Sequence, residues 1–157
     1  MLNIYNYYED AKSLPLYDGI HDSLWMLNHW NRWGRAIPAK DLEPLVGIIM
    51  RKPESAFYYA RGVIGGRWPE AEPTIMKDAG FASWYAEFIL RKDPEWTSRP
   101  GHENGRWPEA EPYIMKDPFN AYCYARDTIG GRWPEAEPFI KKSSDDWWKY
   151  TRKFEVQ

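Results

Sequence analysis

One octapeptide, Gly-Arg-Trp-Pro-Glu-Ala-Glu-Pro, occurs three times in this chain, at residues 66–73, 105–112 and 131–138. Internal repetition of this kind indicates a tandem array rather than a fold built around one central core. A single unit of such length cannot bury its own apolar face, so neighbouring units must pack on one another. The repeat therefore constrains the architecture strongly, but it indicates no particular activity.

The repeated units align over 26 residues when residues 54–79 are taken as the reference. Residues 119–144 match this reference at 16 positions, and the middle unit, 80–118, matches once a 13-residue insertion at 92–104 is set aside. The predicted organisation has three parts: an N-terminal cap with a degenerate repeat (1–53), three tandem helical repeats (54–144) and a C-terminal capping helix (145–157).

Each unit predicts a longer helix followed by a shorter one. The longer helix is clearest at 118–130, where Asp117 is a favourable N-cap and Gly130 a favourable stop. Between them, Ala121, Tyr124, Ala125 and Ile129 recur at helical spacing and form one apolar face. The equivalent faces are Ala56, Tyr59, Ala60 and Ile64 in the first unit, where Gly65 and Gly66 are the stop, and Ala82, Tyr85, Ala86 and Leu90 in the middle unit. The shorter helix begins within the octapeptide. Because the octapeptide has two prolines four residues apart, the sequence does not decide whether the helix begins at the first proline, with a distorted first turn, or nearer the second. The sequence thus predicts an all-α fold, a short solenoid of antiparallel helix pairs with atypical ends, the last helix being capped by Ser144.

Composition narrows the classes of function. The net charge is −2, which is not the basic balance of a general nucleic-acid binder. Aromatic residues make up 17% of the chain, enough for both a core and an adhesive surface. The single cysteine, Cys123, excludes an internal disulfide, and neither a signal peptide nor a long apolar run is evident. We therefore expect a cytoplasmic protein that does not enter a membrane.

The octapeptide arginine and tryptophan, first seen at Arg67 and Trp68, have two interpretations. They either form a ladder that contacts a partner, or they build the joint between repeats, with the arginine pairing to Glu70, Glu72 or an equivalent in the next unit. Three near-identical copies favour the joint, because every repeat needs the same connection. A second repeated position, Arg61 and Arg126, is a candidate for carboxylate or phosphate recognition, although Glu87 reverses the charge in the middle unit.

The insertion at 92–104 is polar and rich in turn-forming residues, so it predicts a loop. Its Trp96, Arg99 and His102 are side chains that commonly anchor an interface, and loops on a rigid scaffold often carry function. The alternative is a tolerated insertion in which Trp96 folds back onto the core. The sequence leaves both alternatives open.

Catalysis and metal binding are not predicted. The two histidines His21 and His29 lie eight residues apart, which is not the spacing of a helical zinc pair. Cys123 has no fixed histidine partner in the sequence. The N-terminal aromatic cluster, which includes Tyr5, Tyr7 and Trp25, is interpreted as a cap on the open end of the array. We expect no catalytic residue, cofactor or metal.

The pattern Arg-Trp-Pro-Glu-Ala-Glu-Pro-x-Ile-Met-Lys-Asp-Pro-x-x-Ala-Tyr-x-Tyr-Ala-Arg resembles repeats in poorly characterised bacteriophage and bacterial proteins. The resemblance covers about residues 51–142 and implies a viral or prophage accessory protein that acts inside a bacterium. By analogy, such a protein binds and inhibits a host enzyme or defence complex. The alternative is a nucleotide or nucleic-acid binder that stacks bases on aromatic rings and holds phosphates with arginine.

Overall fold

The computed structural model describes residues 46–156, apart from the side chain of residue 48. Helices and connecting turns make up this part of the chain, and no strand occurs in it, so the all-α prediction is confirmed there. The predictions for the N-terminal aromatic cluster and for His21 and His29 lie outside the described residues.

Two kinds of helix alternate along the described chain. The longer ones are α5 (Pro53–Tyr59), α7 (Ala79–Phe88), α10 (Pro118–Tyr124) and α12 (Ser144–Phe154). Four-residue helices alternate with them: α4 (Val46–Ile49), α6 (Glu72–Ile75), α9 (Glu111–Ile114) and α11 (Glu137–Ile140). The insertion adds α8 (Pro94–Thr97) and the 3₁₀ turns Leu90–Lys92 and Glu103–Gly105.

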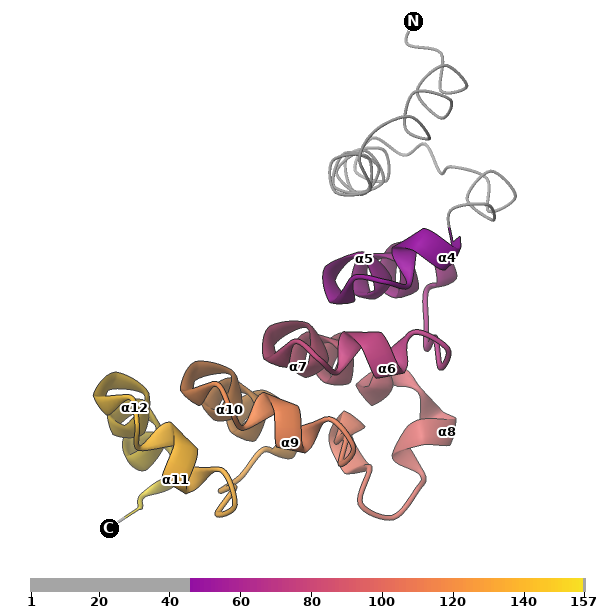
Figure 1. Cartoon of the computed structure of the whole chain (residues 1–157). Coiled ribbons are helices and arrows are strands. Elements are labelled where there is room, and N and C mark those ends of the chain that lie inside the picture. The colour runs from indigo at the N-terminus through magenta and orange to yellow at the C-terminus, as the bar shows by residue number, and fades with distance from the viewer. Residues whose placement is uncertain (1–45, 157) are drawn as a thin grey trace, which may run out of the picture.

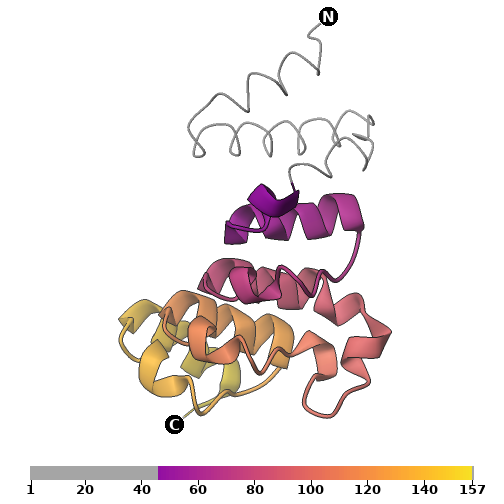
Figure 2. The ribbon, with the colours of Figure 1, turned by 45° about the vertical axis from the view of Figure 1, so that its right-hand side comes forward.

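The long helices follow one another in a curved row, each in contact with the next, and the short helices bridge them (Figure 1). The long helices lie on the inner side of the bend and the short helices on its outer side. The insertion that carries α8 projects from the row beyond the end of α7 (Figure 2). Each helix pair therefore packs chiefly on its neighbours in sequence, as expected of repeated units.

Side chains cap α7, α10 and α12, whereas Lys52 before α5 makes no side-chain cap hydrogen bond. The Asp117 side chain accepts a hydrogen bond from the backbone N–H of Asn120, and Asp78 caps α7 in the same way. The predicted cap of α12, Ser144, is wrong, because Ser144 is the first helical residue and the hydroxyl of Ser143 receives the N–H of Asp146.

The first and third long helices end in a wider turn that the sequence did not predict. The π-helical turns Ala60–Ile64 and Ala125–Ile129 follow α5 and α10 directly. Each turn is closed by a glycine in the left-handed conformation, Gly65 at φ 71° and Gly130 at φ 72°, which confirms the predicted glycine stops. A π turn adds a residue to the helical register, and Ile64, predicted on the apolar face, is instead 44% exposed.

The structure shows that each short helix begins next to the second proline of its octapeptide. The helix α6 begins at Glu72, so its second proline, Pro73, lies in the first turn, where no intrahelical N–H is needed. The residues from Trp68 to Ala71 form a separate turn, in which the N–H of Ala71 bonds the carbonyl of Trp68. The same arrangement recurs in α9 and α11.

Small residues on the buried faces allow the helices to approach closely. Ala82, Ala86, Ala121 and Ala125 are all fully buried, as the spacing predicts. Around them, the aromatic rings of the repeat fill the space between one unit and the next. The core is thus a chain of similar layers rather than a single centre.

Candidate functional site

The octapeptides build the joints between repeats. In the first copy, the Arg67 guanidinium pairs with the Glu72 carboxylate through two hydrogen bonds, Nε to Oε1 at 2.6 Å and Nη2 to Oε2 at 3.0 Å. The backbone N–H of Trp68 donates to the Tyr85 hydroxyl at 2.6 Å, and this hydroxyl donates to Glu72. Tyr85 belongs to the next long helix, so the network fastens one unit to the following one.

The same network recurs at the other two octapeptides. Arg106 pairs with Glu111, and Tyr124 receives the N–H of Trp107 at 2.6 Å. At the third copy, Arg132 pairs with Glu137, and the Tyr150 hydroxyl receives the N–H of Trp133 at 2.6 Å. Of the two interpretations of the octapeptide, the joint is therefore the one that the structure shows. The partner of each arginine is the second glutamate of its own octapeptide.

One tyrosine–tryptophan ring pair lies at each of these joints. Each octapeptide indole packs on the tyrosine of the long helix before it, with ring centroids 4.9 Å apart for Tyr59 and Trp68 and 5.2 Å apart for Tyr85 and Trp107. The third indole packs on Tyr124 in the same way. Each central tyrosine therefore contacts two octapeptides at once, with its ring on one and its hydroxyl on the other. Sequence reasoning missed this role, although the spacing of 17 residues between the tryptophan N–H and the tyrosine hydroxyl that accepts it is constant.

Burial of the joint tyrosines makes the stability of the fold sensitive to high pH. Desolvation raises the pKa of Tyr85, Tyr124 and Tyr150 above the ordinary tyrosine value, against a smaller opposing effect of the hydrogen bonds from the tryptophan N–H groups. A raised pKa in the folded state means that the contribution to stability is complete below the unfolded pKa, about 10, and is lost as the pH rises.

We therefore expect the free energy of unfolding to fall above about pH 10, by up to about 1.4 kcal/mol per pH unit for each joint tyrosine. Urea titrations from about pH 8 to pH 11.5 measure this slope. Tyr124→Phe removes one of the three ionising groups, so its slope should be shallower than that of the parent chain. Equal slopes in the two proteins would contradict the buried, neutral state of Tyr124.

The insertion folds back onto the array through Trp96. This side chain is only 3% exposed, and its indole N–H donates to the carbonyl of Arg106 at 3.0 Å. The Arg67 guanidinium lies 4.2 Å from the centre of the ring, and the His102 ring meets it edge-on. The second alternative for the insertion is thus the one observed. Trp96 anchors the loop, and with its ring covered we do not keep it among the proposed partner contacts.

The other two candidate residues of the insertion lie around this anchor. Arg99 is exposed, pairs with Glu95 at 3.2 Å and lies over the Trp96 ring. His102 is half-buried, and its Nδ1 is 3.1 Å from the carbonyl oxygen of Pro100. Both contacts hold the loop in its own fold. The site prediction for these two residues stays a prediction, at a place separate from the other candidates.

Arg61 and Arg126 lie on the long-helix part of the array, away from Arg99 and His102. Arg126 is fixed by a bidentate ion pair with its neighbour Asp127, and this pair raises the pKa of the guanidinium. Arg61 has Gly62 in the place of that aspartate. Its guanidinium instead lies 4.5 Å from the centre of the Phe88 ring on the next long helix. The five predicted contacts therefore fall in two places rather than one.

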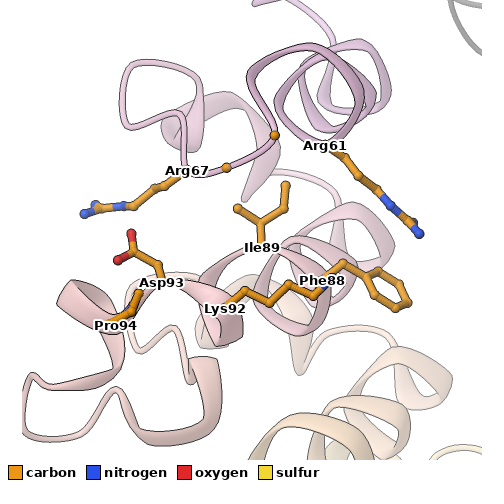
Figure 3. Close-up of a pocket in the computed structure, with 9 residues that line it drawn as sticks. Arg61, Arg67, Phe88, Ile89, Lys92, Asp93 and Pro94 are labelled. Carbon is orange, nitrogen blue, oxygen red and sulfur yellow. The ribbon is translucent and has the colours of Figure 1, made fainter. Parts of the chain in front are cut away.

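A groove opens at the first joint, where the end of α5 meets the end of α7. Its volume is about 380 Å³, and its floor is formed by Ile89 and Phe88 (Figure 3). Arg61 and Arg67 come from the first unit and diverge to either side, while Lys92 and Asp93 come from the start of the insertion. Three cationic side chains against one carboxylate give the groove a positive lining.

Exposed aromatic rings are the other unusual surface feature. Trp84 on α7 is 44% exposed and Phe119 on α10 is 54% exposed. Both lie on the face of their helix opposite the buried alanines and tyrosines. Because the short helices pack on the outer side of the row, we infer that this open face is on the inner side. Sequence reasoning missed these two residues because neither is a repeated residue. Trp84 aligns with Tyr58 of the first unit, and Phe119 aligns with Gly80 of the middle unit.

The described residues contain no group of three or more side chains able to hold a metal ion. In the same part of the chain, no helix has both the length and the apolar character needed to cross a bilayer. Cys123 is half-buried, and its burial raises the pKa of the thiol, which lowers its reactivity as a nucleophile.

Comparison with known proteins gives no relative for this chain. No protein-family model, no curated protein and no solved structure matches it.

Proposed function

We propose that this chain is a non-catalytic, protein-binding helical repeat module whose partner docks on the inner side of the row of long helices. The observation that carries the proposal is the exposure of Trp84 and Phe119 on that side. Large aromatic rings supply most of the binding energy at protein interfaces when a partner covers them. The concave side of a curved helical array is also the surface that repeat proteins commonly use for binding.

These two rings are not needed for the joints. The joint rings, such as Trp107, Tyr124 and Trp133, are at most 1% exposed and already fill the space between units. Trp84 adds edge contacts with Phe81 but leaves much of its indole open to solvent. An array that needed only stability has no use for such exposed rings, and a docking surface does.

Cations accompany the rings on the same side. Lys149 lies 5.9 Å from the centre of the Phe119 ring, and Arg126 is held in place by Asp127 in the π-helical turn after α10. Arginine beside aromatic residues is a typical interface composition. Because each of these cations has an aspartate close by, the surface carries both signs of charge. A mixed surface suits a protein partner better than a polyanion, and the net charge of −2 points the same way.

The proposed source of the partner rests on the resemblance of the repeat to those of bacteriophage and bacterial proteins. A phage accessory protein meets its partners in the bacterial cytoplasm. We therefore propose a host enzyme or defence complex as the partner and inhibition as the outcome of binding. No chemical step is assigned to this chain, because the joint arginines and tyrosines are engaged with one another.

Affinity capture from bacterial lysate, with and without nuclease and followed by mass spectrometry, tests the class of partner. We expect one protein or complex to be retained in stoichiometric amount after nuclease treatment. A capture that disappears with nuclease would contradict the proposal in favour of nucleic-acid binding. Retention of no macromolecule in either condition would also contradict it.

A further inference from the structure

The groove at the first joint has two cationic side chains that no carboxylate of residues 46–156 holds in an ion pair, although the Glu87 carboxylate is near enough to Arg61 to interact with it. Asp93 is committed to the insertion, since its Oδ1 accepts the N–H groups of Glu95 and Trp96. Arg67 is committed to its own glutamate. Arg61 and Lys92, in contrast, have no hydrogen bond or ion pair from their side chains within residues 46–156. Their donors are available to a bound molecule.

The other joints of the described chain lack this combination. At the third joint, Asp127 occupies the position of Gly62 and neutralises the arginine beside it. At the second joint, Glu87 replaces the arginine altogether. The residues Lys92 and Asp93 begin the insertion, which only the middle one of the three units contains. The combination of residues that lines the groove therefore occurs at the first joint and not at the other two.

The lining indicates the chemistry of a ligand. The floor is apolar, with Ile89 only 4% exposed and Phe88 beside it. The mouth is kept open at Gly65 and Gly66, where a Cβ atom would meet nothing within 4 Å. A volume of about 380 Å³ lies at the lower end of the range for small-molecule sites. The groove thus fits a molecule with one anionic group and a small apolar body.

We propose that this groove binds a small organic oxyanion, with its phosphate or carboxylate group between Arg61 and Lys92 and its apolar part against Phe88 and Ile89. A guanidinium donates two parallel hydrogen bonds to either kind of oxyanion, and an ammonium adds a point charge. This site is separate from the protein-binding role of Trp84 and Phe119, so either proposal can fail without the other.

A simpler explanation for the two cations is the helix dipole, because both lie near the C-terminal ends of helical segments. The dipole accounts for positive charge at these ends. It does not account for the open, apolar-floored groove, nor for the loss of the aspartate that accompanies the equivalent arginine in the third unit. Ligand titration separates the two explanations, because the dipole alone predicts no saturable binding.

The experiment is a titration of the full chain with phenyl phosphate, followed by amide NMR shifts and by calorimetry. We expect saturable binding of one equivalent, with shifts at Gly65, Gly66 and Ile89. Arg61→Gln combined with Lys92→Gln should weaken the affinity at least about tenfold. The matched control Arg126→Gln, at the equivalent arginine of the third unit, should leave it within about twofold.

Absence of saturable binding up to about 10 mM phenyl phosphate would overturn the proposal, as would equal affinity in the parent chain and the double variant. Parallel titrations with benzoate and inorganic phosphate identify the ligand class. Tighter binding of phenyl phosphate supports a phosphate monoester, and tighter binding of benzoate supports a carboxylate. Inorganic phosphate binding as well as phenyl phosphate would contradict the role of the apolar floor.

Discussion

Trp107→Ala is expected to lower the free energy of unfolding by about 3–5 kcal/mol. The Trp107 side chain is 1% exposed, and its ring packs 5.2 Å from that of Tyr85. Its removal opens a cavity at the centre of the row, between two long helices. Since a domain of this size is commonly stable by only about 5–15 kcal/mol, such a loss removes a large fraction of its free energy of unfolding.

The matched control is Trp148→Ala on the last long helix. That ring is 59% exposed, so its removal should change the free energy of unfolding by no more than about 0.5–1 kcal/mol. Urea denaturation followed by far-ultraviolet circular dichroism measures both variants. Similar losses for the two tryptophans would contradict the assignment of the octapeptide indole to the joint between repeats.

Gly105→Ala is expected to cost about 3 kcal/mol or more. This glycine opens the second octapeptide and has a φ of 84°, a left-handed conformation that carries a penalty for any residue with a Cβ. The added Cβ would also lie 2.6 Å from the carbonyl oxygen of Ala86 and from the backbone nitrogen of Arg91. Backbone atoms cannot move aside cheaply, so the insertion has to shift away from α7.

Two other glycines separate these effects. Gly101 has a similar φ of 83° with nothing within 4 Å of its Cβ position, so Gly101→Ala should cost only about 1–2 kcal/mol. Gly131 opens the third octapeptide without a positive φ or a close neighbour, and Gly131→Ala should be within about 0.5 kcal/mol of the parent. Thermal denaturation of the three variants ranks their losses of stability, and we expect the largest loss for Gly105→Ala and the smallest for Gly131→Ala. A loss for Gly105→Ala no larger than that for Gly101→Ala would contradict the close contact.

Much of the helical plan follows from local signals. The cap at Asp117 and the stops at Gly65 and Gly130 depend on neighbouring residues alone, and the sequence therefore predicts them. The equality of the three octapeptides also favours their role as joints, because identical copies imply identical contacts. The helix caps and stops are predictable because each is determined by residues within one helical turn of it.

What the sequence did not predict depends on contacts between units. The tyrosine hydroxyl at the joint meets a tryptophan N–H 17 residues earlier, across a change of chain direction. The π-helical turns have no distinct residue pattern, and of their two terminal isoleucines Ile64 is exposed whereas Ile129 is half-buried. Trp96 becomes buried because Arg67 and the carbonyl of Arg106 meet it from two separate units. The groove in turn exists only because the insertion begins beside that joint.

The central claim is that a protein partner docks on the inner side of the long helices. The most direct test is the equilibrium affinity of the captured partner for the double variant Trp84→Ser and Phe119→Ser, compared with the parent chain. Tyr113→Ser, an exposed aromatic change on the short helix α9, is the control. We expect a loss of affinity of about 30-fold or more for the double variant and about twofold or less for the control. Unchanged affinity in a folded double variant would contradict the claim.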